Sequence, residues 1–199
     1  MNRQKPFIVE FTGTPEAGKT TTIHIIYELL TSLGYKVKLY PESAESTPHF
    51  FPKKSIEANI WRNFDTFKHV LEAPYQSDYD IIILDRGAID RTFWVYLDSI
   101  YDFTSSVKNA PFLGIIKDYN PDLLITLIVT PEEAIKRKGG EGTIVTKEFI
   151  CNYNNLLTVF INSIGINKTI ICTDNRAIND VVDEVQKLIL ENVKKEPSP

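Results

Sequence analysis

The sequence predicts a three-layer α/β fold with a parallel sheet, and three observations support this prediction. Five short apolar runs have the composition of strands, and they cover residues 7–11, 35–40, 80–84, 123–130 and 169–173. Runs such as "DIIILD" and "LLITLIV" are almost continuously apolar, which is typical of strands covered on both faces in a parallel sheet. Helical patterns alternate with these runs, as a layered α/β domain requires.

The helical patterns each have a recognisable face or boundary. Residues 19–34 follow a glycine-rich loop and end at Gly34, a residue suited to the position after a helix. Apolar side chains recur every three or four positions in residues 147–165 and again in residues 177–193, which places them on one face of each helix. Residues 59–71 are helical in pattern and rich in aromatic side chains.

Length and composition indicate one domain and exclude several classes of protein. The chain has 199 residues, of which 43% are hydrophobic, so one core over residues 1–194 and a disordered tail over 195–199 are expected. The net charge of -4 and the lack of a long basic run argue against binding of double-stranded nucleic acid. No run is long enough to span a membrane or resembles a secretory signal, so we expect a cytoplasmic protein with no membrane partner.

A phosphate-binding motif, G-x4-GK[ST], follows the first apolar run and opens the first helical pattern. Its glycines let successive backbone N–H groups point at phosphate oxygens, and the positive end of the following helix favours the same anion. The motif predicts that Lys19 bridges the β- and γ-phosphates of ATP and that Thr20 binds Mg²⁺. A glycine turn with a surface lysine is the alternative, but it does not explain the position between strand and helix. The predicted ATP-binding residues here are Gly13, Thr14, Pro15, Glu16, Ala17, Gly18, Lys19, Thr20 and Thr21.

Two charged residues end the third apolar run, where a parallel sheet places its ligands. Asp85 is predicted to organise Mg²⁺, although an Asp after a strand also often caps the next helix. Arg86 is suited to phosphate because its planar guanidinium donates two parallel hydrogen bonds. An ion pair with Asp90 or with a glutamate is the alternative role for Arg86.

The sequence indicates less clearly which residues would bind a molecule that accepts the phosphoryl group. Glu42 follows the second apolar run and could accept the proton of an attacking hydroxyl, bind a sugar hydroxyl, or be solvated. Trp61 and Phe64 could line a pocket for a planar base, but aromatic residues at this spacing are equally typical of a hydrophobic core.

A candidate lid covers residues 131–146. Lys136, Arg137 and Lys138 gather at the end of its helical pattern, just before "GGEG". Such a segment could close over phosphates and supply positive charge. Cations at a helix C-terminus are also favourable on their own, so a plain surface helix is the alternative.

The motifs "FTGTPEAGKTT", "PES", "LDRG", "TPEEAIKRK" and "ICTDN" occur in this order over most of the chain. With them the sequence resembles the P-loop small-molecule kinases of the thymidylate kinase and deoxynucleoside kinase group. It is also similar to a looser set of P-loop ATPases in which "DRG" follows the third strand. The resemblance implies the P-loop NTPase fold, with a five-stranded parallel sheet in the order 2-3-1-4-5.

The resemblance also implies roles for individual residues. Lys19 and Thr20 match the phosphate and Mg²⁺ positions, and Glu42 matches the base of deoxynucleoside kinases. Asp85 and Arg86 match an acidic residue and an arginine that contacts phosphates or substrate. Arg137 matches a lid arginine that acts in catalysis, and Arg176 could stack on adenine.

The sequence departs from the pattern of this group at several positions. Gly87 stands where a serine or a bulky polar residue is common, and Asp65 stands where the group's pattern has a glutamine that reads the base. The lid carries Arg137 and Lys138 side by side rather than two well-separated arginines. These departures leave the acceptor open.

The leading hypothesis is an ATP-dependent phosphotransferase whose partner is a nucleoside, a nucleoside monophosphate or a similar small acceptor. Glu42 would orient an attacking hydroxyl, whereas Arg86 or Arg91 would hold an acceptor that is already phosphorylated. A nucleotide-dependent regulator or switch is the alternative, although "NKTI" lacks the aspartate of a guanine-reading N-K-x-D motif. Phosphorylation of a nucleic-acid 5′ end would need a basic groove, and assembly as a homodimer is compatible with the kinase hypothesis.

Overall fold

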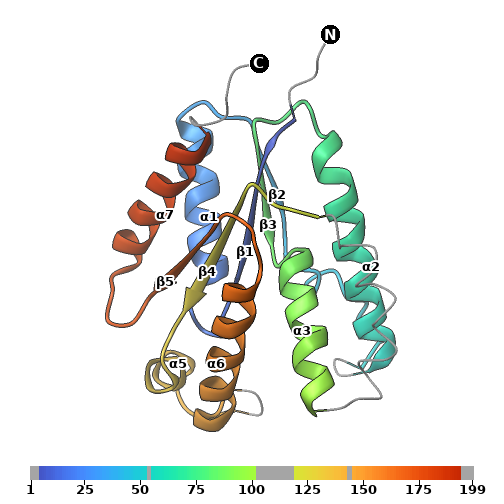
Figure 1. The fold of residues 1–199 in the computed structure, drawn as a ribbon, viewed down its shortest axis with the longest axis vertical. Helices are drawn as coiled ribbons and strands as arrows, with labels where there is room; N and C mark the ends of the chain where they lie inside the picture. Colours follow the sequence, from blue (N-terminus) through green and yellow to red (C-terminus); the bar gives the residue numbers. More distant parts are fainter. Residues whose placement is uncertain (1–4, 53–54, 102–118, 143–144, 194–199) are drawn as a thin grey trace.

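The computed structural model describes residues 5–52, 55–101, 119–142 and 145–193. Its centre is a sheet of five parallel strands in the order β2-β3-β1-β4-β5 (Figure 1). The strands are β1 (Phe7–Gly13), β2 (Val37–Tyr40), β3 (Ile81–Asp85), β4 (Leu123–Ile128) and β5 (Lys168–Cys172). This confirms the predicted fold class and strand order.

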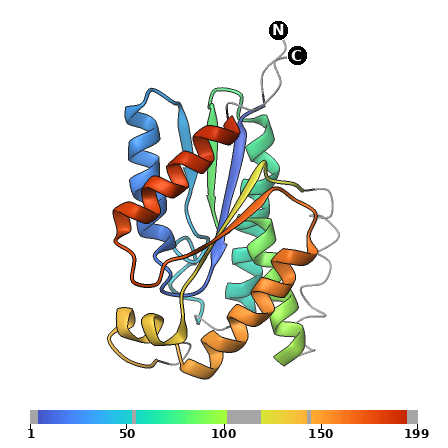
Figure 2. The same ribbon diagram turned by 60° about the vertical axis from the view of Figure 1, so that its left-hand side comes forward.

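Helices cover both faces of the sheet, so the fold has three layers (Figures 1 and 2). On one face lie α1 (Lys19–Ser32) and α7 (Ile178–Val193). On the other lie α2 (Ile56–Glu72), α3 (Ala88–Tyr101) and α6 (Lys147–Ser163). The short 3-10 helix η1 (Ala73–Tyr75) follows α2, and α5 (Pro131–Lys138) follows β4.

The central strand β1 is buried along its whole length, and its side chains alternate between the two layers of helices. Val9 and Phe11 pack in the cluster that includes residues of α1 and α7. Ile8 faces the other layer, and by the same alternation so do Glu10 and Thr12. Two polar side chains of β1 therefore lie beneath α3 in the middle of the fold.

Every predicted strand differs from the observed one by one or two residues at one or both of its ends. The strand predicted at residues 123–130 ends at Ile128, because Thr130 caps α5 and accepts a hydrogen bond from the backbone of Glu133. The strand predicted at residues 35–40 begins at Val37. The predicted tail over residues 195–199 lies outside the described residues.

Parallel strands end at the same edge of the sheet, so the loops after β1, β2, β3 and β4 come together there. In the register of the sheet, Phe11 is opposite Asp85 and Gly13 is opposite Leu127. This edge carries the predicted site. In the described part of the chain, the helices are all too short or too polar to cross a membrane.

Candidate active site

The loop between β1 and α1 has the backbone of an anion-binding cradle. A Cβ atom at Gly13 would lie 1.9 Å from the carbonyl oxygen of Leu127, so only glycine fits there. Gly18 has a φ of 84°, in the left-handed region that favours glycine. The N–H of Thr14 donates to the carbonyl oxygen of Leu127 at 3.0 Å, which fixes the loop against β4.

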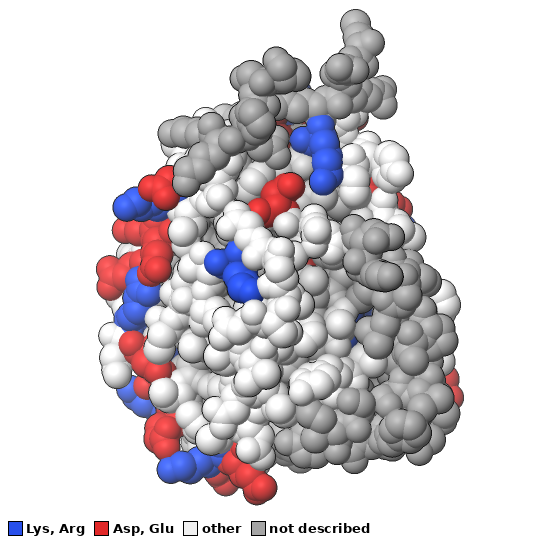
Figure 3. Space-filling view, in the orientation of Figure 1, with Lys and Arg blue, Asp and Glu red and all other residues white. Residues whose placement is uncertain are grey.

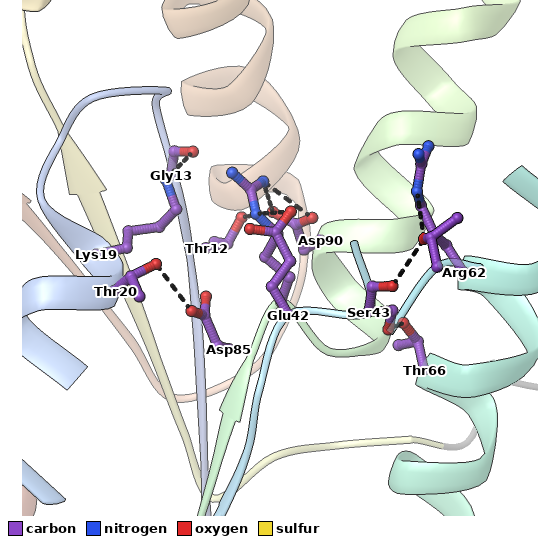
Figure 4. A network of polar contacts seen from close by, with 12 residues as sticks. Thr12, Gly13, Lys19, Thr20, Glu42, Ser43, Arg62, Thr66, Asp85 and Asp90 are labelled. Carbon is purple, nitrogen blue, oxygen red and sulfur yellow. Dashed lines mark hydrogen bonds and ion pairs between the residues drawn. The ribbon is translucent and has the colours of Figure 1, made fainter. Parts of the chain in front are cut away.

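Lys19 lies under this loop and holds it closed. Its Nζ donates to the carbonyl oxygen of Gly13 at 3.0 Å (Figure 4) and to that of Thr14 at 2.7 Å. Burial, together with the nearby Arg86 guanidinium, lowers the pKa of Lys19 to about 7, although nearby carboxylates oppose the shift. Phosphate oxygens would add negative charge beside this amine and raise its pKa.

Thr20 and Asp85 form the pair predicted to bind Mg²⁺. The Thr20 hydroxyl donates to Oδ2 of Asp85 at 3.1 Å (Figure 4). The other carboxylate oxygen, Oδ1, is buried and makes no hydrogen bond with the described residues. Burial raises the pKa of Asp85, while Arg86 opposes that shift. A hydroxyl beside a carboxylate with an unused oxygen is a donor set that suits a hard cation.

This pair would not hold a metal ion by protein oxygens alone. Within the described residues no three His, Cys, Asp or Glu side chains come together as a metal site. Mg²⁺ commonly binds with one or two protein ligands and completes its shell with water and substrate phosphates. The residues present therefore fit Mg²⁺ carried by a nucleotide.

Arg86 connects the loop after β2 with the first turn of α3. Its Nε lies 2.8 Å from Oε1 of Glu42, and its Nη1 lies 3.2 Å from Oδ1 of Asp90. Burial alone would lower the pKa of Arg86, but the carboxylates of Asp90 and Glu42 outweigh it and raise the pKa. The ion pair with Asp90 considered from the sequence is thus present, and Glu42 joins it. We call these three residues the Arg86 cluster.

Two further arginines lie close to the Arg86 cluster. Burial lowers the pKa of Arg91; Arg86 and Arg62 lower it further, while Asp90 and Glu42 oppose the shift. The Nε of Arg91 is buried and makes no hydrogen bond with the described residues. Arg62 of α2 donates to the Thr47 hydroxyl at 3.2 Å. Three arginines and two carboxylates therefore gather on this side of the site.

The predicted aromatic residues lie elsewhere. Trp61 and Phe64 are 42% and 61% exposed. They line a cavity of about 550 Å³ together with Phe51, Glu57, Ile60, Asp65 and Lys68. Neither Glu42 nor Arg86 lines this cavity. The structure thus brings Trp61 and Phe64 together with each other but not with the Arg86 cluster.

Arg137 lies on the far side of the phosphate loop, where it joins α5 to the loop after β5. Its Nη1 donates to the Thr173 hydroxyl at 3.0 Å and to the Glu16 carbonyl at 3.2 Å, and its Nε donates to Glu133 at 3.1 Å. Arg137, Arg176 and Thr21 line a cavity of about 320 Å³ beside the start of α1. Both arginines therefore lie where the base of a nucleotide held by the loop could reach.

Two residues of α6 support the phosphate loop, and the sequence reasoning missed this role. The Tyr153 hydroxyl donates to the Gly13 carbonyl at 3.2 Å. Asn154 accepts from the Thr14 hydroxyl at 2.5 Å and donates to the carbonyl of Val129 at 2.8 Å. The signal in the sequence is the polar run "NYNN" within an otherwise apolar helix.

Comparison with known proteins gives the family. No protein-family model matches the sequence. A probable thymidylate kinase of Sulfolobus acidocaldarius is 31% identical over 144 residues, which are 66% of this chain and 68% of that protein. The chain belongs to the thymidylate kinase family. A probable thymidylate kinase of Archaeoglobus fulgidus is 26% identical over 195 residues, which are 92% of this chain and 94% of that protein.

Solved structures of this kinase group share the fold. A deoxyadenosine kinase from M. mycoides superposes with a TM-score of 0.70 and 20% identity, over 92% of this chain and 99% of that one. A thymidylate kinase from Candida albicans superposes with a TM-score of 0.64 and 16% identity, over 96% of this chain and 94% of that one. Membership of the family makes the chain a kinase. It favours the kinase hypothesis over a nucleotide-dependent switch that has no acceptor.

Proposed function

We propose that the protein transfers the γ-phosphoryl group of ATP to a nucleoside monophosphate, with thymidylate as the first candidate. The observation that carries this proposal is the placement of two consecutive residues at the edge of the sheet. Asp85 faces Thr20 of the phosphate loop, whereas Arg86 faces Glu42 on the loop after β2. The donor and acceptor halves of a phosphoryl-transfer site thus meet at the end of β3. The names of the family's relatives support thymidylate as the acceptor.

Phosphoryl transfer depends on alignment and on stabilisation of charge rather than on covalent help from the protein. The backbone N–H groups of the phosphate loop and the amine of Lys19 would hold the β- and γ-phosphates. Thr20 and Asp85 would hold Mg²⁺, which when bound neutralises charge on the transferred group. Lys19 would release the carbonyls of Gly13 and Thr14 to make these contacts.

The charges around Arg86 favour an acceptor that already carries a phosphate. Oε1 of Glu42 lies 2.8 Å from Nε of Arg86, so this carboxylate already has a charged partner. The buried Nε of Arg91 provides an unused donor nearby. Arginine recognises phosphate through paired, charge-assisted hydrogen bonds. Arg86 and Arg91 would hold the acceptor phosphate, and Glu42 would orient Arg86.

The segment over residues 131–146 would act as the lid. Arg176 would contact the donor base from the cavity beside α1, which Arg137 also lines. The glycines after α5 include Gly139 and Gly140, with φ values of 81° and 135°, and such residues allow a hinge to move. Closure of this segment would bring Lys138 and Arg137 over the triphosphate and exclude water.

The charge distribution supports a small acceptor over a nucleic acid. Acidic and basic side chains are interspersed along the edge formed by α7, and no broad basic stripe crosses the described residues on this face (Figure 3). A duplex-binding surface would need clustered Lys and Arg along one face. A homodimer and a cytoplasmic location stay predictions.

The test is a panel of acceptors incubated with γ-labelled ATP and Mg²⁺. We expect label on thymidylate or another nucleoside monophosphate at a rate well above ATP hydrolysis, and no label on nucleosides. Lys19→Ala should abolish the transfer. Hydrolysis alone, at the same rate with and without every acceptor, would contradict the proposal.

A second variant distinguishes the two kinds of acceptor. If a nucleoside is labelled instead, Glu42→Gln should slow that transfer strongly, because a neutral amide cannot accept the hydroxyl proton. With a monophosphate acceptor the same variant should mainly raise the KM of the acceptor, because only the orientation of Arg86 is disturbed.

A further inference from the structure

Helix α3 differs from three other helices of the protein in how its first turn is completed. Ser55, Thr130 and Thr146 precede α2, α5 and α6, and each accepts a hydrogen bond from the backbone N–H three residues later. Such caps satisfy N–H groups that have no partner inside the helix. The corresponding residue of α3 is Gly87, whose carbonyl accepts from the N–H of Arg91 at 3.2 Å. Glycine has no side chain with which to cap.

Glu10 supplies the missing cap from the central strand. Its Oε1 accepts from the N–H of Asp90 at 2.9 Å, across 80 positions in sequence. Asp90 is the third helical residue, so this is the N–H that a serine at position 87 would have bound. The backbone N–H of Ile89 also interacts with the Glu10 carboxyl and lowers its pKa. The Glu10 side chain is completely buried.

The space for this carboxyl exists because residue 87 is glycine. A Cβ atom at Gly87 would lie 2.6 Å from Oε2 and 2.7 Å from Cδ of Glu10. Gly87 is not among the glycines with positive φ, so the backbone does not require glycine. Any larger residue would instead displace the carboxyl of Glu10. This explains why the chain lacks the serine or bulky polar residue expected after Asp85-Arg86.

Strand β1 contacts α3 at a second point. The Thr12 hydroxyl donates to Oδ1 of Asp90 at 2.6 Å, and this oxygen also lies 3.2 Å from Nη1 of Arg86 (Figure 4). Glu10 therefore fixes the backbone of Asp90 while Thr12 fixes its side chain. Both come from the strand that ends in the phosphate loop.

We propose that Glu10 is a positioning residue that caps α3 from across the sheet and so holds Asp90 and Arg86 in register with the phosphate loop. A serine at position 87 would tie α3 only to itself. The carboxyl of Glu10 ties α3 to β1, so that the donor and acceptor halves of the site are attached to one strand. The effect on catalysis rests on the proposed function, whereas the capping does not.

The capping is tested by thermal unfolding of Glu10→Ala, Gly87→Ser and the double variant. Glu10→Ala leaves the N–H of Asp90 without a partner, and Gly87→Ser displaces a buried carboxyl. Each should lower Tm by about 2 °C or more. In the double variant the introduced serine can cap α3 and no carboxyl is displaced, so it should melt above both single variants. A double variant that melts no higher than the less stable single variant would overturn the cap.

Two controls accompany this cycle. Gly165→Ser places the same side chain where a Cβ meets no atom within 4 Å, and it should leave Tm unchanged. Glu10→Gln keeps an oxygen acceptor of the same shape and should not lower Tm. If Glu10→Ala alone does not fold, recovery of folding in the double variant supports the cap, and failure of both variants to fold overturns it.

The positioning role is tested by phosphoryl transfer from ATP to thymidylate. Glu10→Ala should lower kcat by about 10- to 100-fold, because small misplacements of charged groups are costly, while the KM of ATP changes little. The double variant should recover most of kcat. Full kcat in Glu10→Ala with a lowered Tm would show a purely structural cap. A wild type that labels no acceptor would contradict the proposed function instead, and the thermal cycle would still decide the cap.

Discussion

Asp85 and Arg86 are neighbours in sequence, yet their side chains diverge to different halves of the site. Asp85 completes β3 and meets the phosphate loop. Arg86 has a φ of 65°, a left-handed conformation that is strained for a residue with a side chain. Its N–H nevertheless donates to the carbonyl of Phe11 at 3.0 Å, which fixes this turn to β1. The turn at the end of β3 thus directs Asp85 toward Thr20 and Arg86 toward Glu42.

The lowered pKa of Lys19 predicts that the protein takes up a proton when it binds ATP. The pKa of Lys19 is about 7 in the free protein, so the amine is largely neutral at pH 8. The phosphates of ATP would raise that pKa, so binding at pH 8 should take up as much as about one proton. Calorimetry in buffers of different ionisation enthalpy measures this number. Lys19→Met should bind more weakly and without the uptake; equal uptake in both proteins would contradict the assignment.

Asp85→Asn separates the role of the carboxylate from its effect on folding. The asparagine keeps the shape and can still accept from the Thr20 hydroxyl, and it removes a buried charge whose pKa burial has raised. We expect stability to be unchanged or slightly higher, and Mg²⁺-dependent transfer to fall by roughly two orders of magnitude. The matched control is Asp78→Asn, a residue before β3 and away from the phosphate loop. A fully active Asp85→Asn enzyme would exclude the metal role.

At the scale of elements, α6 does more than cover the sheet. Leu157 and Ile161 pack in the core with Tyr153, while the Tyr153 hydroxyl reaches the carbonyl of Gly13. Burial raises the pKa of Tyr153, so this hydroxyl stays protonated and can donate. Because α6 begins directly after the proposed lid, we expect α6 to transmit movement of the lid to the phosphate loop.

Two adjacent asparagines test this connection. Asn154→Ala removes the acceptor of the Thr14 hydroxyl and the donor to Val129. Leaving such partners unpaired costs about 1–3 kcal/mol, so we expect the Kd of ATP to rise about tenfold or more. Asn155→Ala is the control, because the side chain of Asn155 makes only a weak contact with Cys151, at 3.9 Å, among the described residues. Equal ATP affinities of the two variants in a titration would show that α6 does not support the loop.

For the whole molecule, a carboxyl in the middle of the sheet makes stability depend on pH. Burial raises the pKa of Glu10 to about 8, from an ordinary value of 4.5; Asp90 raises it as well, whereas the hydroxyl of Tyr119 lowers it. Between these two values the folded protein retains a proton that the unfolded chain releases. The free energy of unfolding contributed by Glu10 therefore falls as pH rises from about 4.5 to about 8, and changes no further above that.

Urea unfolding of the wild type and Glu10→Gln at pH 5, 6 and 7 measures this contribution. The glutamine does not titrate, so the stability of the variant relative to wild type should grow with pH. The limit is about 1.4 kcal/mol per pH unit. The comparison stops at pH 7 because Lys19, with a lowered pKa of about 7, contributes in the opposite direction above it. A difference that is constant from pH 5 to 7 would contradict the raised pKa of Glu10.

The sequence by itself determined the parallel sheet, the phosphate loop and the charged pair after β3. These depend on local features: β-branched runs that must be buried on both faces, and glycines at fixed spacing between a strand and a helix. It could not determine the partners of the charges. The ion pair of Arg86 with Glu42, the cap of α3 by Glu10 and the position of Arg137 beside Thr173 each join residues far apart in the chain.

Only the tertiary structure decided these contacts, because they depend on strand register and on which helix packs over which strand. In the sequence Glu10 is a lone charge in an apolar run, and its role emerges only when β1 lies beneath α3. Gly87 resembles an ordinary turn residue, and its role emerges only when the Glu10 carboxyl occupies the space beside it. Trp61 and Phe64 could have faced a ligand or the core, and packing of α2 placed them in a cavity away from Arg86. Local sequence fixes which groups are present, and long-range packing fixes which of them meet.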